Sequence, residues 1–165
     1  MRGLLWVALL GLVAADAHAQ SIDVDRIRIF EYGIYSGRTE ASRPQEGTAT
    51  GTINTVADLK LVAQTERIPA RIGTRFGFGY EVVGRPRDAS ARMTFITRFP
   101  PQGVVNANGI MYFQNEFEAS VPVGVAMTRT YTFDEPWELA TGEWTLEIHY
   151  RGRKLAEKRF VVVEP

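Results

Sequence analysis

Residues 144–163 of this 165-residue chain read WTLEIHYRGRKLAEKRFVVV. Apolar side chains occupy every second position of 144–150, and polar side chains fill the positions between them. A short turn around Gly152 separates this run from a second run at 155–163. Two such runs joined by a glycine-containing turn predict a β-hairpin. Because 160–163 is apolar without interruption, we expect both faces of the second strand to be covered near its end.

The same period of two occurs in three segments upstream, at 75–82, 91–99 and 125–133. Aromatic and other apolar residues form one face of each segment, and on 125–133 that face also carries Arg129. On 75–82 the opposite face holds Gly77 and Gly79, which leave room for a second backbone or an aromatic ring close to the sheet. Less regular apolar runs predict further strands at 22–35, 59–66 and 110–118.

Composition favours strands over helices. From residue 20 to the C-terminus the chain has 13 valines, 10 isoleucines and 14 threonines, against 5 leucines and 3 methionines. Side chains that branch at Cβ lose rotamer freedom on a helix and pack well on a pleated sheet. About eight strands, without helical periodicity, predict an all-β, immunoglobulin-like two-sheet sandwich. A small antiparallel β-barrel is the alternative.

Two segments do not fit the strand pattern. Residues 36–58 are polar and rich in threonine, glycine and serine. Structureless loops of that length are uncommon in compact domains, so this segment is either a mobile functional loop or a weak hairpin. Residues 102–124 carry Ile110, Phe113 and Phe117, so we expect this segment to pack against the domain.

The N-terminus has the pattern of a secretory signal peptide. One positive charge precedes an apolar run at 4–15, and Ala17 and Ala19 supply small side chains at the cleavage position. The apolar run has twelve residues, whereas a membrane-spanning helix needs about 20. We therefore predict a cleaved signal peptide at 1–19 and a single β-sandwich domain at 20–165. The protein would be periplasmic or secreted, with no permanent membrane span.

Charge and residue content argue against several functional classes. The sequence has 19 basic and 19 acidic residues and no cysteine. Nucleic-acid binding depends largely on neutralised phosphates, so balanced charge argues against a nucleic-acid partner. Without cysteine there is no disulfide scaffold, thiolate metal site or cysteine nucleophile. Signal cleavage leaves His149 as the one histidine, which argues against a histidine metal site or a serine triad, and no cofactor is expected.

The best candidates for catalysis are carboxylates beside an aromatic ring. Asp134 and Glu138 flank Trp137, whose ring can stack on a sugar. Glycoside hydrolysis needs only two carboxylates at the right separation. The competing interpretation is a turn that ends a strand, with its acids in water and Trp137 over the core.

Arginines supply a second candidate site, for binding. Arg75, Arg92 and Arg98 would form an anion-attracting surface if they shared one sheet face. Otherwise they belong to the solvated face of an ordinary sandwich and pair with glutamates.

Four stretches of the sequence, 31–35, 67–77, 95–100 and 133–163, resemble a bacterial family known only as a domain of unknown function and found in short exported proteins. The similarity spans roughly 32–163 and is strongest toward its C-terminal end. It implies an exported bacterial domain, and it brings no catalytic residues with it.

These features predict a non-enzymatic, exported module that binds a protein or a glycan of the cell envelope through its loops or a sheet edge. Export, one small domain and the lack of a complete catalytic set favour this function. Two alternatives are a small carbohydrate-active hydrolase that uses the carboxylates near Trp137, and an inhibitor of an envelope enzyme.

Overall fold

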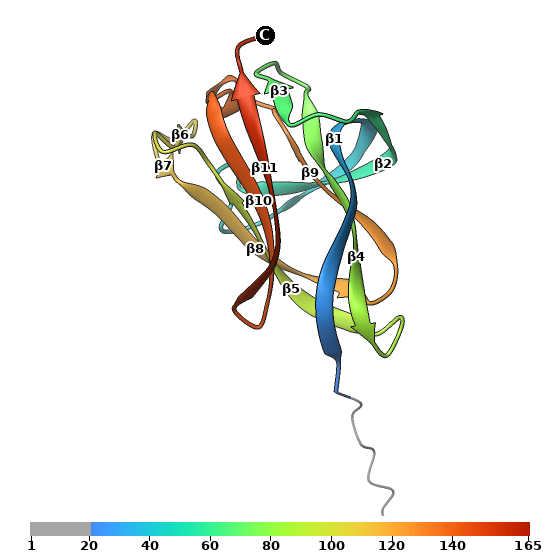
Figure 1. The fold of residues 1–165 in the computed structure, drawn as a ribbon. Helices are drawn as coiled ribbons and strands as arrows, with labels where there is room; N and C mark the ends of the chain where they lie inside the picture. Colours follow the sequence, from blue (N-terminus) through green and yellow to red (C-terminus); the bar gives the residue numbers. More distant parts are fainter. Residues whose placement is uncertain (1–20) are drawn as a thin grey trace, which may run out of the picture.

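The chain folds into two β-sheets packed face to face (Figure 1). The computed structural model describes residues 21–165, so the predicted signal peptide at 1–19 lies outside the described residues. In the described part, no helix has the length and hydropathy needed to cross a membrane. The elements in chain order are β1 (Asp23–Pro44), β2 (Thr52–Ala63), β3 (Arg67–Pro69), β4 (Arg75–Arg85), β5 (Ser90–Arg98), β6 (Val104–Val105), β7 (Met111–Tyr112), β8 (Gln114–Pro122), β9 (Ala126–Thr132), the short 3-10 helix η1 (Pro136–Glu138), β10 (Gly142–Tyr150) and β11 (Arg153–Val163).

The strand order shows a sandwich with open edges. One sheet has the order β2-β1-β4-β9, and the other has the order β3-β11-β10-β5-β8. Neighbouring strands are antiparallel, except for β3 and β11, which are parallel. The first sheet ends at β2 and β9, the second ends at β3 and β8, and the two do not close into a barrel. The predicted two-sheet sandwich is therefore confirmed, and the barrel alternative is wrong.

Aromatic side chains from both sheets fill the space between them. The ring centroid of Phe76 lies 5.2 Å from that of Phe160 and 6.0 Å from that of Trp144, both on the opposite sheet. Trp144 also meets Phe99 edge-on at 4.9 Å. All four side chains are buried. Edge-on ring pairs at these separations stabilise a core beyond the area that they bury, and the predicted inward faces of these strands are confirmed.

The C-terminal hairpin forms as predicted, with one correction. Arg151 and Gly152 connect β10 to β11 with φ values of 50° and 77°, as in the type I′ turns that match the twist of paired strands. Phe160 and Val162 of β11 are buried, but Val161 between them is 41% exposed. The prediction that both faces are covered at 160–163 is wrong, because β11 lies in a two-layer sandwich whose outer face meets solvent.

Gly77 and Gly79 provide the close approach expected from the sequence. A Cβ on Gly77 would lie 1.9 Å from the carbonyl oxygen of Arg129, and a Cβ on Gly79 would lie 2.5 Å from the ring of Phe30. Both distances are far below van der Waals contact. The glycines therefore admit a neighbouring backbone and an aromatic ring, as predicted.

Residues 36–58 form a long hairpin arm, which we call the strap. The first part of β1 pairs with β4, and its continuation pairs with β2 instead. The loop 45–51 joins the two strands of the arm. The arm leaves its own sheet and crosses to the side of β8 in the other sheet (Figure 1). Of the two alternatives for this segment, the hairpin is confirmed.

The segment 102–124 packs only in part. Phe117 on β8 is buried and stacks on Phe95, with ring centroids 5.4 Å apart. Met111 and Phe113, in and beside the small β6-β7 ribbon, are more than half exposed. The expectation of packing therefore holds for β8 and for Val104 and Tyr112 of the ribbon, and it is wrong for Ile110, Met111 and Phe113.

Candidate functional site

Arg75 does not share a surface with the other two predicted arginines. It lies on β4, whereas Arg92 and Arg98 lie on β5 of the opposite sheet. The buried Arg75 side chain donates hydrogen bonds to the carbonyl oxygen of Gly37 (2.7 Å) and to Oγ1 of Thr132 (2.9 Å). Arg75 therefore ties the base of the strap to β9 and does not contribute to a joint anion-attracting surface.

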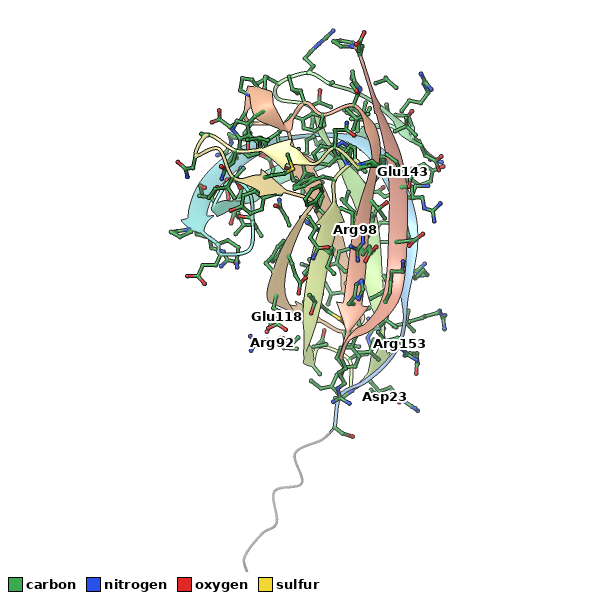
Figure 2. All side chains as sticks on the ribbon, turned by 90° about the vertical axis from the view of Figure 1, so that its left-hand side faces the viewer. Asp23, Arg92, Arg98, Glu118, Glu143 and Arg153 are labelled. Atoms are coloured by element: carbon green, nitrogen blue, oxygen red, sulfur yellow. The ribbon has the colours of Figure 1, made fainter. Side chains whose placement is uncertain are left out.

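Arg92 and Arg98 each pair with a glutamate on the outer face of their sheet. Arg92 Nη2 lies 2.7 Å from Glu118 Oε2, and Arg98 Nε lies 2.8 Å from Glu147 Oε1. Figure 2 shows Arg92 beside Glu118, with Arg98 further along the sheet. This placement agrees with the interpretation in which the arginines pair with glutamates.

His149 belongs to the same ion-pair cluster. Its Nε2 atom lies 2.6 Å from Glu147 Oε2, on the face of β10 that points away from the core. Glu147 thus holds both Arg98 and the imidazole. Within residues 21–165, no group of three or more histidine, cysteine, aspartate or glutamate side chains is placed to hold a metal ion.

Glu138 is a buried structural acid. One oxygen accepts a hydrogen bond from the Tyr131 hydroxyl at 2.5 Å, and the other accepts two from the backbone N–H groups of Asp134 and Glu135, both at 2.8 Å. Its side chain is 1% exposed, whereas Asp134 and Glu135 face water. The interpretation that the acids of this turn are solvated is therefore right for Asp134 and wrong for Glu138, because Glu138 folds back to satisfy the start of η1.

Trp137 packs partly against the core, as the turn interpretation expects. It also lines a cavity of about 340 Å³ together with Asp134 and Glu135, on one side of the strap tip. The indole Nε1 atom is buried and has no hydrogen-bond partner among the described residues. Trp137 and Asp134 therefore lie at a cavity, and Asp134 and Glu138 also line the neighbouring one.

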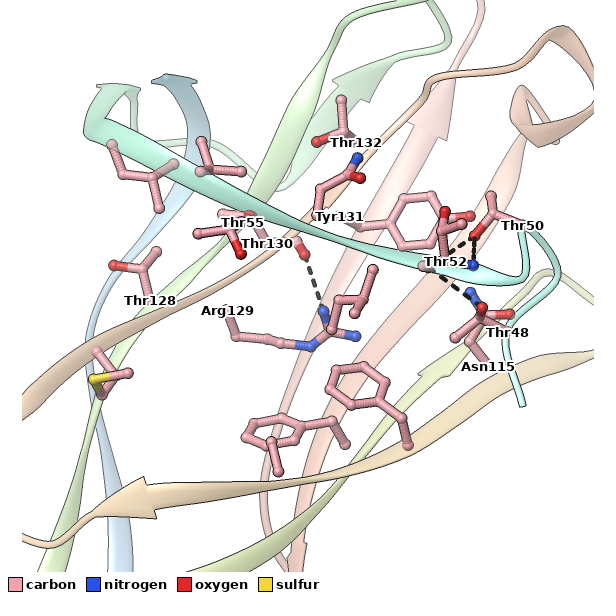
Figure 3. Close-up of a pocket in the computed structure, with 18 of the residues that line it drawn as sticks. Thr48, Thr50, Thr52, Thr55, Asn115, Thr128, Arg129, Thr130, Tyr131 and Thr132 are labelled. Carbon is pink, nitrogen blue, oxygen red and sulfur yellow. Dashed lines mark hydrogen bonds between the residues drawn. The ribbon is translucent and has the colours of Figure 1, made fainter. Parts of the chain in front are cut away.

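The larger cavity lies under the strap, between the open edges β8 and β9, and has a volume of about 380 Å³ (Figure 3). The strap contributes residues from the loop and from β2 to its lining. β9 contributes the run from Met127 to Thr132, and β8 contributes the run from Asn115 to Val121 except Glu116 and Glu118. Phe95 and Tyr80 reach the cavity from the sheets behind. The cavity exists because the two sheet edges are left open and the strap covers the gap.

Arg129 is the central charged group of this cavity. Its guanidinium lies over the rings of Phe117 and Phe95, at 5.0 Å and 5.8 Å from their centroids. Nη2 donates to Thr97 Oγ1 at 2.8 Å, and Nη1 donates to the carbonyl oxygen of Thr130 at 3.0 Å. Nε has no partner, and no carboxylate of residues 21–165 lies within ion-pair distance of this side chain. Arg129 is therefore a cation packed on aromatic rings without an acid to balance it.

Four hydrogen bonds hold the strap over Arg129. The backbone N–H of Ala49 donates to Asn115 Oδ1 at 2.7 Å, and Asn106 Nδ2 donates to the carbonyl oxygen of Ala49 at 3.1 Å. The N–H of Glu116 donates to the carbonyl oxygen of Gly47 at 2.8 Å. The fourth bond, from Asn54 Nδ2 to Asp134 Oδ2, measures 3.0 Å. The tip of an arm from one sheet is thus fixed to the edge strand of the other.

Comparison with known proteins identifies the family. A model of the family described as a domain of unknown function, DUF3859, matches residues 23–162. The chain belongs to this family. An immunoglobulin-like protein from Pseudomonas aeruginosa with a known crystal structure is similar to this DUF3859 domain, with 27% sequence identity and a TM-score of 0.61, over 89% of this chain and 100% of that chain. No curated protein matches the chain. The family resemblance and the immunoglobulin-like fold inferred from the sequence are confirmed.

Burial determines the charge states of the groups that line the cavity under the strap. It lowers the pKa of Arg129 to about 10, and it raises the pKa of Tyr80 to about 12. Burial, together with the charge of Glu138, raises the pKa of Tyr131 well above its ordinary value. At neutral pH the arginine therefore remains charged and both phenols remain neutral. The cavity therefore contains the positive charge of Arg129, which is poorly hydrated and packs on the rings of Phe95 and Phe117.

Of the two acids that line the cavity under the strap, Glu138 is the buried one. Burial raises the pKa of Glu138 above its ordinary value of 4.5, although its hydrogen bonds act in the opposite direction. A raised carboxyl pKa in a cavity is a common sign of an acid catalyst. The oxygens of Glu138 are, however, already occupied by three donors. The arrangement is therefore suited to holding a ligand by its polar groups.

Proposed function

We propose that this DUF3859 protein is an exported, non-enzymatic binding module of the bacterial cell envelope, and that the cavity under the strap is its ligand site. The observation that carries the proposal is Arg129, a cation that lies in a cavity of about 380 Å³ without an acid partner among the described residues. Pockets of roughly 300–1,000 Å³ are typical of small-ligand sites. The size of the cavity favours a glycan fragment or another small molecule over a folded protein as the ligand.

The N-terminal pattern supports export. A positive charge, an apolar run of twelve residues and small residues at the predicted cleavage position make up the first 19 residues. Fractionation of cells that express the full chain tests this part of the proposal. We expect the processed protein, beginning near Gln20, in the periplasmic or extracellular fraction. Retention of the unprocessed chain in the cytoplasm would contradict it.

The contacts of Glu138 favour binding over hydrolysis. In a glycosidase the general acid gives its proton to the leaving oxygen of the substrate, which requires a free carboxyl oxygen. Both oxygens of Glu138 accept hydrogen bonds from the protein itself. The two alternative functions, a carbohydrate-active hydrolase and an inhibitor of an envelope enzyme, remain predictions. None of these contacts favours either of them.

Filling the cavity tests the proposed site. Ala119 lines the cavity, whereas the neighbouring Glu118 is exposed and lies outside its lining. We expect Ala119→Trp to abolish the binding of soluble envelope saccharide fragments, measured by ligand-observed NMR, and Glu118→Trp to retain it. Both variants are first compared with the unmodified protein by circular dichroism. Equal binding by the two folded variants would exclude the cavity as the site.

A further inference from the structure

The free donors of Arg129 point to the kind of group that the cavity recognises. An arginine has five N–H groups in a planar fork. Two of them are donated within the protein, to Thr97 and to Thr130. The aromatic rings of Phe95 and Phe117 cover one face of the guanidinium and accept no conventional hydrogen bond. The Nε atom is buried, so the second N–H group on each of Nη1 and Nη2 is left for an anion, and charge-assisted hydrogen bonds from arginine are among the strongest in proteins.

The charges around the cavity favour a ligand with a single negative charge. Among the described residues that line it, Arg129 is the one cation, and Asp134 and Glu138 are the acids. A phosphate dianion would bring two charges toward one cation. A carboxylate carries one charge and matches the guanidinium fork in shape. Asp134 accepts a hydrogen bond from Asn54 of the strap, and Glu138 lies in η1, so both acids are at the same end of the cavity. Their negative charge would orient the carboxylate of a ligand away from that end of the cavity.

The rest of the lining is rich in hydroxyl and amide groups. These groups belong to Thr48, Thr50, Thr52, Asn54, Thr55, Asn115, Ser120, Thr128, Thr130 and Thr132. In Figure 3 the labelled threonines of β2 and β9 lie around Arg129. The hydroxyls of Thr48 and Thr50 donate to backbone carbonyl oxygens, and that of Thr132 accepts from Arg75. Because a hydroxyl both donates and accepts, each keeps some hydrogen-bonding capacity for a ligand. A lining of this kind is complementary to a ligand that carries several hydroxyl groups of its own.

We infer that the cavity binds a small hydroxylated monocarboxylate, of the acidic-sugar class, with its carboxylate on Arg129 and its hydroxyls on the threonines of β2 and β9. This inference rests on the proposed binding function of the cavity. It adds the chemical class of the ligand and the contact that selects it. The cavity volume of about 380 Å³ accommodates a ligand of one or two sugar rings.

Four probes separate the features of such a ligand. D-Glucuronate has both the carboxylate and the hydroxyls, D-glucose lacks the charge, cyclohexanecarboxylate lacks the hydroxyls, and inorganic phosphate supplies an anion alone. Dissociation constants are measured by ¹H–¹⁵N NMR titration of the purified protein. We expect D-glucuronate to bind at least about tenfold more tightly than each of the other three.

Variants of Arg129 test the contact itself. We expect Arg129→Gln to weaken D-glucuronate binding by at least about tenfold, and Arg129→Lys to weaken it less, because lysine keeps the charge and loses the fork. Arg92→Gln serves as the matched control, because Arg92 lies on the outer sheet face and outside the cavity lining, and its variant should bind like the unmodified protein.

The possible failures are distinguishable. If D-glucose binds as tightly as D-glucuronate and Arg129→Gln changes neither, the acidic ligand is wrong and the cavity stands as a neutral-sugar site. If cyclohexanecarboxylate or phosphate binds as tightly as D-glucuronate, the hydroxyl lining does not select the ligand and the inference fails. D-Glucuronate that still binds the Ala119→Trp variant binds elsewhere, which overturns the proposed site as well. No saturable shift with D-glucuronate also overturns the inference.

Discussion

The backbone N–H of Ala49 donates a hydrogen bond of 2.7 Å to the side chain of Asn115, and this bond joins the tip of the strap to the edge strand of the opposite sheet. Both residues are buried. The bond closes a cavity that would otherwise be an open gap between β8 and β9.

Asn115→Ala removes the strap contact. The buried N–H of Ala49 loses its acceptor, which should lower the free energy of unfolding by about 1–3 kcal/mol. Hydrogen exchange of residues 45–58 should become faster than that of β10 and β11, because the strap opens locally. Glu118→Ala, on the exposed face of the same strand, serves as the control. Unchanged exchange in the strap of the Asn115 variant would contradict the role given to this bond.

Arg129→Met should leave stability unchanged or raise it. The pKa of Arg129 is lowered to about 10, below its ordinary value of 12.5, so the folded protein holds this proton less tightly than the unfolded chain does. The charge therefore costs stability at every pH below about 10, and its removal should add up to about 2 kcal/mol. Urea unfolding at neutral pH measures the change. A loss of more than about 1 kcal/mol would mean that the arginine is a structural residue.

Glu138→Gln should change the pH dependence of stability. The pKa of Glu138 is raised above 4.5 by burial, so the folded state holds the proton more tightly than the unfolded state. The stability from this group is present below pH 4.5 and is lost as the pH rises through the folded pKa. The unfolding free energy of the unmodified protein, relative to the variant, should therefore fall as the pH rises above 4.5. A difference that grows with pH would refute the sign of this shift.

Trp144→Ala and Val161→Ala should differ strongly, although both lie in the C-terminal hairpin. Trp144 is fully buried among aromatic rings, so its truncation should cost about 3–5 kcal/mol. Val161 is 41% exposed, so its truncation should cost less than about 1 kcal/mol. Chemical denaturation of both variants gives the comparison. Similar losses would show that the inner and outer faces of the β10-β11 hairpin have been placed wrongly.

The layers of the fold were predictable because a period of two determines which side chains share a face. The alternation at 144–150 and at 75–82 places Trp144 and Phe76 inward, and both are buried. The strap could not be predicted to the same degree. It is held by contacts between residues 57 and 66 positions apart in the sequence, which a local pattern does not contain.

The candidate site was predictable only in its parts. The alternation places Arg129 on an inward face of its strand. That no acid pairs with it could not be predicted, because this depends on which strands lie opposite. Arg75 and Arg92 look alike in the sequence and lie in different sheets, because the chain crosses between the sheets from β4 to β5. The burial of Glu138 likewise follows from the fold of one turn and not from its residue types.

The central claim is that Arg129 anchors a ligand under the strap, and a crystal structure of the protein with D-glucuronate tests it most directly. We predict density for the sugar between β2 and β9, with its carboxylate within hydrogen-bond distance of the Arg129 guanidinium. Density at the Trp137 cavity or on the outer sheet face, with the cavity at Arg129 unchanged, would contradict the claim.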